Sequence, residues 1–180
     1  MNKKYEKIIV SKSELFDVYE LAPHLRDDDL RELNVFNLSA EQGLLRGYIY
    51  SDECFTARYK NKIICMFGVS GMGMPLGCAS IWFLGSDDMV CHALTFLKDG
   101  RKYINYFLSK YKMLINAVDK RNKTHINWIK KVGLMILEPI IINGFEFLPF
   151  CSKQNNCKFE QLNNNGEKKY KKKRRKKCVI

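Results

Sequence analysis

Two acidic residues lie three positions apart in a stretch whose pattern predicts a helix over residues 26–36. Asp29 and Glu32 therefore share one face of that helix, because residues i and i+3 are neighbours on a helical surface. A carboxylate in such a position could act as a general base that takes a proton from a nucleophile. Acidic residues near the start of a helix are also ordinary partners of its dipole, so both roles are open for this pair.

His92 is a further candidate for acid–base chemistry, since an imidazole changes charge close to neutral pH. It follows a predicted strand over residues 78–84 and a break at Gly85, whereas His125 falls in the first turn of a later predicted helix. Either histidine could instead have a purely structural role. No spacing of serine or cysteine with histidine and an acid indicates a hydrolase.

Basic residues crowd the C-terminal segment, where residues 168–177 hold nine lysines and arginines and no acid. Without these nine, 22 basic residues face 19 acidic ones, so the formal charge of +12 belongs mainly to this tail. Such a run attracts polyanions, because each neutralised phosphate releases counterions. We predict that the tail binds DNA or RNA; an anionic membrane surface and a merely solubilising terminus are the alternatives. The residues predicted to contact nucleic acid are Lys171, Lys172, Lys173, Arg174, Arg175, Lys176 and Lys177.

Seven cysteines raise the question of disulfides or a metal site. Four of them (Cys54, Cys65, Cys78 and Cys91) lie in or beside apolar runs, and no Cys-x-x-Cys pair occurs. The three histidines stand far apart in the sequence. We therefore expect buried free thiols and no metal site.

Apolar periodicity and turn residues divide residues 1–152 into the elements of one domain. Ser11 or Ser13 can cap the first helix, which Pro23 ends, and Ser39 with Gln42 has capping-box spacing. From residue 153 onward the sequence is polar and is expected to be disordered. The predicted strands are residues 7–10, 55–59, 63–69, 78–84, 134–142 and 145–150, and further helices are predicted over residues 26–36, 39–50 and 101–111.

The stretch around which the other elements are arranged runs from Asn122 to Leu134. Asn122 or Thr124 can cap a helix, since a side-chain oxygen there accepts a hydrogen bond from an amide of the first turn. Ile126 and Ile129 fall on one apolar face. Gly133 suits the left-handed residue that commonly ends a helix.

Several short motifs in this order resemble the GNAT N-acetyltransferases. They are residues 79–85 (ASIWFLG), 96–111, 118–122 (VDKRN), 128–133 (WIKKVG) and Pro149-Phe150. The wider run is similar to a tailed-phage branch of that fold, some of whose members are internal virion proteins. The resemblance implies an α/β (α+β) fold with a central mixed, mostly antiparallel, twisted sheet and helices on both faces. It also implies a strand at residues 113–118, where periodicity alone would continue the preceding helix.

The resemblance further implies acetyl-CoA as a cofactor. Its pyrophosphate would lie on a loop at residues 98–102 before the central helix, because amides at a helix start attract anions. Its pantetheine arm would lie beside the strand that carries Trp82, and an Asn after the next strand would contact the arm. The cofactor-binding residues so implied are Ser80, Ile81, Trp82, Phe83, Gly100, Arg101, Lys102 and Asn122.

Many members of the family carry a tyrosine that acts as general acid within the helix after Asn122. Ile129 stands at that place, and it has no proton to donate. The candidates for catalysis are then Asp29, Glu32 and His92.

Two functions are consistent with these features. The first is an acyl-CoA-dependent N-acyltransferase that acts on a primary amine. The second is a catalytically inactive GNAT-like protein, a virion or nucleic-acid-associated component tethered by its basic tail. The single glycine of the predicted cofactor loop and the missing tyrosine favour the second. No apolar run approaches the roughly 20 residues that span a bilayer, so we expect a cytoplasmic protein, in a host cytoplasm or a virion if a phage encodes it.

Overall fold

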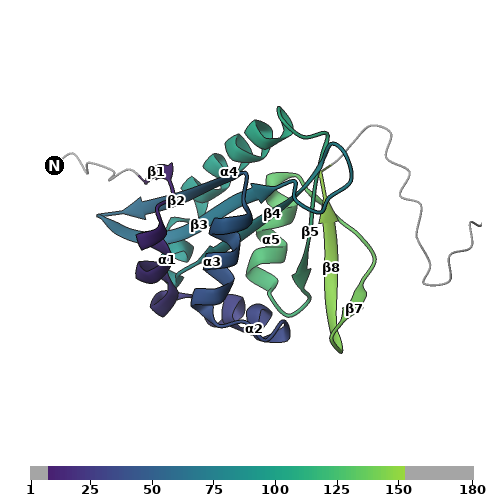
Figure 1. The fold of residues 1–180 in the computed structure, drawn as a ribbon, viewed down its shortest axis with the longest axis horizontal. Coiled ribbons are helices and arrows are strands. Elements are labelled where there is room, and N and C mark those ends of the chain that lie inside the picture. Colours follow the sequence, from purple (N-terminus) through teal and green to yellow (C-terminus); the bar gives the residue numbers. More distant parts are fainter. Residues whose placement is uncertain (1–7, 153–180) are drawn as a thin grey trace, which may run out of the picture.

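Within the described residues, eight strands form one mixed sheet at the centre of the molecule (Figure 1). The computed structural model describes residues 8–152, and the side chains of residues 90–97 lie outside that description. The strands are β1 (Ile9–Lys12), β2 (Glu53–Tyr59), β3 (Lys62–Ser70), β4 (Cys78–Gly85), β5 (Met113–Asp119), β6 (Met135–Ile136), β7 (Ile140–Ile142) and β8 (Phe145–Cys151). The helices are α1 (Leu15–Leu21), η1 (Ala22–His24), α2 (Asp27–Val35), α3 (Ala40–Tyr50), η2 (Asp87–His92), α4 (Ala93–Leu108) and α5 (Lys123–Val132), where η marks a 3-10 helix.

The strands lie in the order β1-β2-β3-β4-β5-β8-β6, and β7 pairs with the other end of β8. Among the described pairs only β4 and β5 run parallel; the others are antiparallel. A parallel pair needs a long crossover connection, and α4 supplies it. The expected mixed, mostly antiparallel sheet is therefore confirmed.

Helices cover both faces of the sheet, as expected. On one face, Val18 of α1 and Leu44 of α3 pack against Met66 of β3, and all three side chains are fully buried. On the other face, Ile104 of α4 and Ile129 of α5 pack over the centre of the sheet. Because β-strand side chains alternate between faces, β4 sends Ile81 to the second core and Trp82 to the first.

Local sequence signals set several of these boundaries. The Gln42 amide donates to Ser39 Oγ at 3.2 Å and the Ser39 amide donates to Gln42 Oε1 at 3.0 Å, which confirms the capping box of α3. Asn122 Oδ1 accepts from the His125 amide at 3.0 Å and starts α5. Gly133 ends α5 with φ of 97°, a left-handed conformation that glycine adopts without strain.

The strand expected after the central helix is present as β5, between β4 and β8. The apolar residues of this segment have a spacing that also suits a helix. Pairing on both sides decides in favour of the strand, because five residues of β5 register with β8. Tertiary context here overrides a helical period.

The predicted central helix is present as α4, but it runs from Ala93 to Leu108, so the predicted bounds of 101–111 and the predicted loop at 98–102 are wrong. Gly100, Arg101 and Lys102 lie inside the helix, where intrahelical hydrogen bonds occupy their amides. Gly100 has a packing role instead, since a Cβ at this position would meet Trp128 Cζ2 at 2.6 Å. The glycine lets α4 and α5 approach closely.

Two smaller predictions also fail. Neither Ser11 nor Ser13 caps α1: the N-cap is Glu14, whose amide donates to Asp17 Oδ2 at 3.0 Å, and Ser13 bonds to Thr56 instead. The strand predicted over residues 134–142 is divided into β6 and β7 by a segment that contains Pro139, which has no amide to donate to a ladder.

The Asn143-Gly144 hairpin between β7 and β8 is confirmed, and both residues have positive φ, at 47° and 84°. In the part of the chain that is described, no helix has the length and apolar character needed to cross a membrane.

Candidate functional site

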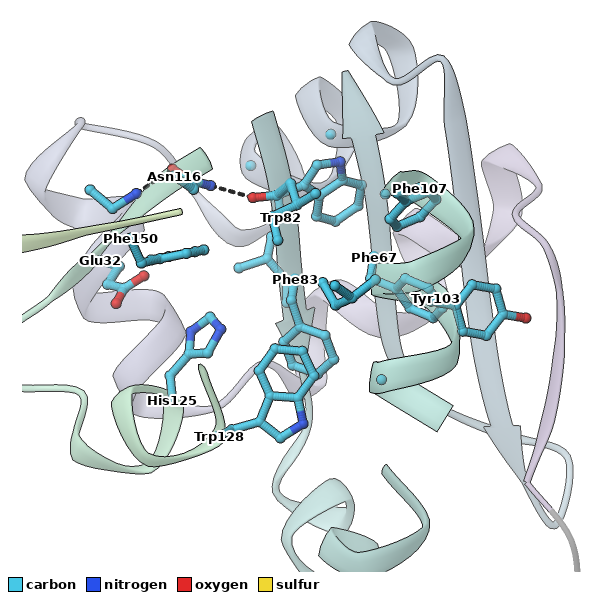
Figure 2. Close-up of a pocket in the computed structure, with 18 of the residues that line it drawn as sticks. Glu32, Phe67, Trp82, Phe83, Tyr103, Phe107, Asn116, His125, Trp128 and Phe150 are labelled. Atoms are coloured by element: carbon cyan, nitrogen blue, oxygen red, sulfur yellow. Dashed lines mark hydrogen bonds between the residues drawn. The ribbon is translucent and has the colours of Figure 1, made fainter. Parts of the chain in front are cut away.

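The parallel strands β4 and β5 pair over only three positions and then separate. The last paired position joins Ser80 to Ile115. One residue further along each strand, the Asn116 side chain reaches across, and its Nδ2 donates to the Ile81 carbonyl oxygen at 2.5 Å (Figure 2). Asn116 Oδ1 accepts from the Ala117 amide at 2.7 Å. A side-chain amide thus replaces the backbone partner that the Ile81 carbonyl loses where the strands diverge.

A cavity of about 340 Å³ occupies the gap. Its volume lies in the range typical of sites for small ligands. Aromatic side chains from several elements dominate the wall, and Figure 2 shows two of them, Phe83 and Trp128, next to each other. The aromatic lining residues are Phe36, Phe67, Trp82, Phe83, Tyr103, Phe107, His125, Trp128, Phe147 and Phe150.

Helix α2 spans the end of the gap with the two acidic residues singled out from the sequence. Asp29 Oδ2 accepts from the amide of Gly85, the last residue of β4, at 2.8 Å. Glu32 Oε1 accepts from the amide of Asp119, the last residue of β5, at 2.8 Å. One carboxylate therefore holds the end of each separated strand. The i,i+3 spacing matters because it sets the distance that the helix bridges.

Asp29 does not line the cavity and has a structural set of partners. It is 1% exposed and forms an ion pair with Arg26, which is 4% exposed. Burial raises the pKa of the Asp29 carboxyl, although Arg26 and the Gly85 amide oppose the shift. The geometry thus gives Asp29 the task of attaching α2 to β4 and leaves none of its oxygens free for a substrate.

Glu32 does line the cavity. Burial raises the pKa of its carboxyl to about 7, and the nearby Asp29 and Asp119 carboxylates act in the same direction. The Asp119 amide and the Asn122 side chain, whose Nδ2 lies 3.4 Å from Oε1, favour the ionised form. A carboxyl that is half ionised near neutral pH can exchange a proton with a ligand.

Asn122 is 1% exposed and does not reach the cavity wall. Its Oδ1 caps α5 and its Nδ2 faces Glu32. The predicted contact between Asn122 and a cofactor therefore has no geometric support, whereas the capping alternative is realised.

The structure brings four of the other predicted cofactor residues to the cavity and leaves three away from it. Ile81, Trp82, Phe83 and Gly100 line it. Ser80 is paired within the sheet, and Arg101 donates to the Lys131 carbonyl oxygen at 2.7 Å. Lys102 lines a separate surface groove beside Glu53. The side chain of His92 and residues 171–177 lie outside the described residues, so their roles stay predictions.

Asn116, Trp128 and Phe150 line the cavity, although their role there was not expected from the sequence. Only Asn116 left a signal, as a polar residue inside an otherwise apolar strand. His125, weighed only as an alternative, also lines the cavity. Burial lowers the pKa of its imidazole to about 3, and the Arg26 cation acts in the same direction.

Among the described residues, no group of three or more histidine, cysteine or acidic side chains could hold a metal ion. Within the described part of the chain, Cys54, Cys65 and Cys78 are free thiols.

Solved structures with a similar fold include acetyltransferases of the GNAT family, whereas no family model and no curated protein matches the sequence. The GNAT acetyltransferase from Bacillus anthracis matches with a TM-score of 0.62 at 11% identity, over 82% of this chain and 95% of that one. The ribosomal-protein-alanine N-acetyltransferase from Brucella melitensis matches with a TM-score of 0.57 at 8% identity, over 80% and 98%. A GNAT acetyltransferase from Streptococcus pneumoniae gives 0.54 at 12% identity, over 81% and 98%. At these identities the likeness shows the fold.

The residues at the open end of the gap do not fit the diphosphate of acetyl-CoA. The segment between β4 and α4 carries exposed Asp87 and Asp88 and no glycine, lysine or arginine. The Gly85 amide, a donor that an anion would seek there, already serves Asp29. Two exposed carboxylates repel a polyphosphate where basic side chains and unpaired amides would attract it.

Breaking the buried ion pair should destabilise the fold strongly. We expect Asp29→Ala to lower the free energy of unfolding by about 3–5 kcal/mol, because it strands the Arg26 charge. Asp28→Ala is the matched control: its pair with Arg31 is 31% and 42% exposed and should contribute less than about 1 kcal/mol. Urea unfolding measures both. Equal losses in the two variants would contradict the assigned role of Asp29.

The raised pKa of Glu32 predicts a pH-dependent stability. Between the ordinary value of 4.5 and the folded value of about 7, the folded protein retains a proton that the unfolded chain has lost. The free energy of unfolding should therefore fall as pH rises through this interval. Glu32→Gln should remove that part of the slope and be more stable than the parent at pH 8 by roughly 3 kcal/mol.

Urea titrations at several pH values test this, with Glu20→Gln on the exposed side of α1 as the control. A Glu32→Gln profile parallel to that of the parent would show that Glu32 titrates normally.

Proposed function

Because the chain has the GNAT fold, we propose that it is a GNAT-like protein that does not bind CoA and that its basic tail holds it on nucleic acid. The proposal that the protein does not bind CoA rests on one observation: two carboxylates of α2 accept hydrogen bonds from amides at the ends of the separated strands. At the open end of the gap, Asp29 accepts a hydrogen bond from the Gly85 amide and Glu32 accepts one from the Asp119 amide. The same end carries Asp87 and Asp88.

Asn116 supports the same conclusion from within the gap. Its side-chain amide donates to the Ile81 carbonyl oxygen, which leaves that oxygen less available to an extended ligand lying along β4. Ile129, which stands where many members of the family carry a tyrosine, is fully buried in the core and has no proton to donate. A virion component of a tailed phage is the setting that the sequence resemblance suggests for such a protein.

A second candidate function is N-acyl transfer to a primary amine, and one observation favours it. The Glu32 carboxyl, with its pKa of about 7, faces the cavity between the separated strands. A base of this strength can accept the proton that an amine releases when it is acylated. In this case Glu32 would be the catalytic residue, and the cavity would receive the amine.

Calorimetry with acetyl-CoA separates the two candidates. We expect no heat of binding at ligand concentrations up to millimolar, because no described cation lines the gap. Free CoA and a thermal melt of the same sample are the controls for non-specific binding and for folding. Saturable binding of acetyl-CoA would instead support acyl transfer, provided that Phe83→Ala, which alters the cavity wall, abolishes this binding.

The tail predicts salt-sensitive binding to DNA or RNA. The full chain should be retained on immobilised duplex DNA at low salt, and the logarithm of its affinity should fall with the logarithm of salt concentration with a slope of roughly −6 for seven contacts. Deleting residues 168–180 should abolish retention.

A tail with the same composition in scrambled order is the matched control. It should bind as tightly as the natural tail, since contacts to phosphates do not read sequence. Unchanged retention after the deletion would refute the tail proposal and leave the proposal on CoA untouched.

A further inference from the structure

One part of the cavity is a chamber of aromatic rings between the sheet and helices α4 and α5. We define the aromatic chamber by Phe67, Phe83, Tyr103, His125 and Trp128, which all line the cavity. The Phe83 and Trp128 rings stack with centroids 5.8 Å apart, and His125 lies 5.8 Å from Phe83 and 5.9 Å from Trp128. Tyr103 packs edge-on against Phe67 at 4.8 Å. Figure 2 shows Phe83 near the middle of this group, with His125 and Trp128 on one side of it and Phe67 and Tyr103 on the other.

Two polar atoms in the chamber have no hydrogen-bond partner among the described residues. They are Trp128 Nε1 and His125 Nδ1, and both are buried. Leaving a buried donor unsatisfied costs free energy, so such atoms commonly have a partner. The other indole of the chain is an internal contrast: Trp82 Nε1 donates to Ser51 Oγ at 2.7 Å. The free donor is thus specific to the wall of the chamber.

The charges around the cavity restrict which kind of ligand can supply a hydrogen-bond acceptor to Trp128 Nε1. No described lining residue is lysine or arginine, whereas Glu32 and Asp99 contribute carboxyl groups. An anion would therefore enter without a counter-charge, at a high desolvation cost. An organic cation would suit the carboxyl groups, but an ammonium group has no acceptor to offer the Trp128 indole. An uncharged ligand with an acceptor oxygen satisfies both conditions.

The shape of the chamber indicates the rest of the ligand. The cavity of about 340 Å³ that these rings line offers ring faces and edges on which another ring can stack or pack edge-on. We propose that the aromatic chamber binds an uncharged aromatic molecule whose carbonyl or ether oxygen accepts a hydrogen bond from Trp128 Nε1. This site needs neither CoA nor the tail, so it goes beyond the function proposed above.

The two tryptophans make the proposal directly measurable in the full chain. Their indole N–H groups give two proton–nitrogen NMR signals, and Trp128→Phe assigns them by removing one. The probes are acetophenone, ethylbenzene, benzoate and benzylammonium, which share a ring and differ in acceptor and charge. Acetophenone should shift the Trp128 signal saturably and downfield, as a new hydrogen bond does. The Trp82 signal should move less, because its bond to Ser51 is already made.

The affinities of the four probes should also depend on the acceptor oxygen and on charge. Acetophenone should bind roughly 3- to 10-fold more tightly than ethylbenzene, the range that one net hydrogen bond provides. Benzoate and benzylammonium should bind more weakly than acetophenone. In Trp128→Phe, which keeps an aromatic ring in the wall, acetophenone should lose its advantage over ethylbenzene.

Equal affinities of acetophenone and ethylbenzene for the parent protein would overturn the role of the indole. A tightest complex with benzoate or benzylammonium would overturn the assignment of an uncharged ligand. The absence of any saturable shift would overturn the site itself. The comparison of probes on the parent protein decides the matter even if Trp128→Phe does not fold.

Discussion

The separation of β4 from β5 is the constraint on which the rest of this structure depends. Two parallel strands that part after three paired positions expose backbone amides and carbonyls inside the protein. Such groups must find other partners, because an unsatisfied buried amide costs free energy comparable to a lost hydrogen bond. Here the partners are side chains: Asn116 serves the Ile81 carbonyl, Asp29 the Gly85 amide and Glu32 the Asp119 amide.

This arrangement explains why α2 lies where it does. An i,i+3 pair of carboxyl groups spans about one helical turn, and the ends of β4 and β5 are held at the two members of that pair. Arg26 compensates the buried charge of Asp29, and burial keeps Glu32 only partly ionised at neutral pH. The helix thus lies across the open end of the gap. It also supplies Glu32, whose carboxyl faces the cavity and has a pKa near neutrality.

The likeness of the fold and the composition of the site are separate questions in this protein. The likeness to GNAT acetyltransferases extends over about four-fifths of the chain at 11% identity. A fold of this kind can be maintained by packing with many different sequences and does not by itself define a function. The chemistry depends on a few groups at the gap, and here these are carboxylates and aromatic rings.

The sequence by itself determined most of the elements and little of the site. Capping at Ser39 and Asn122, the left-handed Gly133 and the Asn143-Gly144 turn are local interactions, so a few neighbouring residues suffice to specify them. The spacing of Asp29 and Glu32 likewise revealed a shared helical face.

Only the tertiary structure decided what that face meets. Asp29 and Glu32 looked equivalent in sequence, yet one is enclosed with Arg26 and the other faces the cavity, because residues 56 and 87 positions away supply their amide partners. The length of α4 and the strand at β5 were decided in the same way: Gly100 is tolerated in a helix because Trp128 packs on it, and β5 is extended because β8 pairs with it. Contacts between residues distant in the chain carry no local signal, and the site consists almost entirely of such contacts.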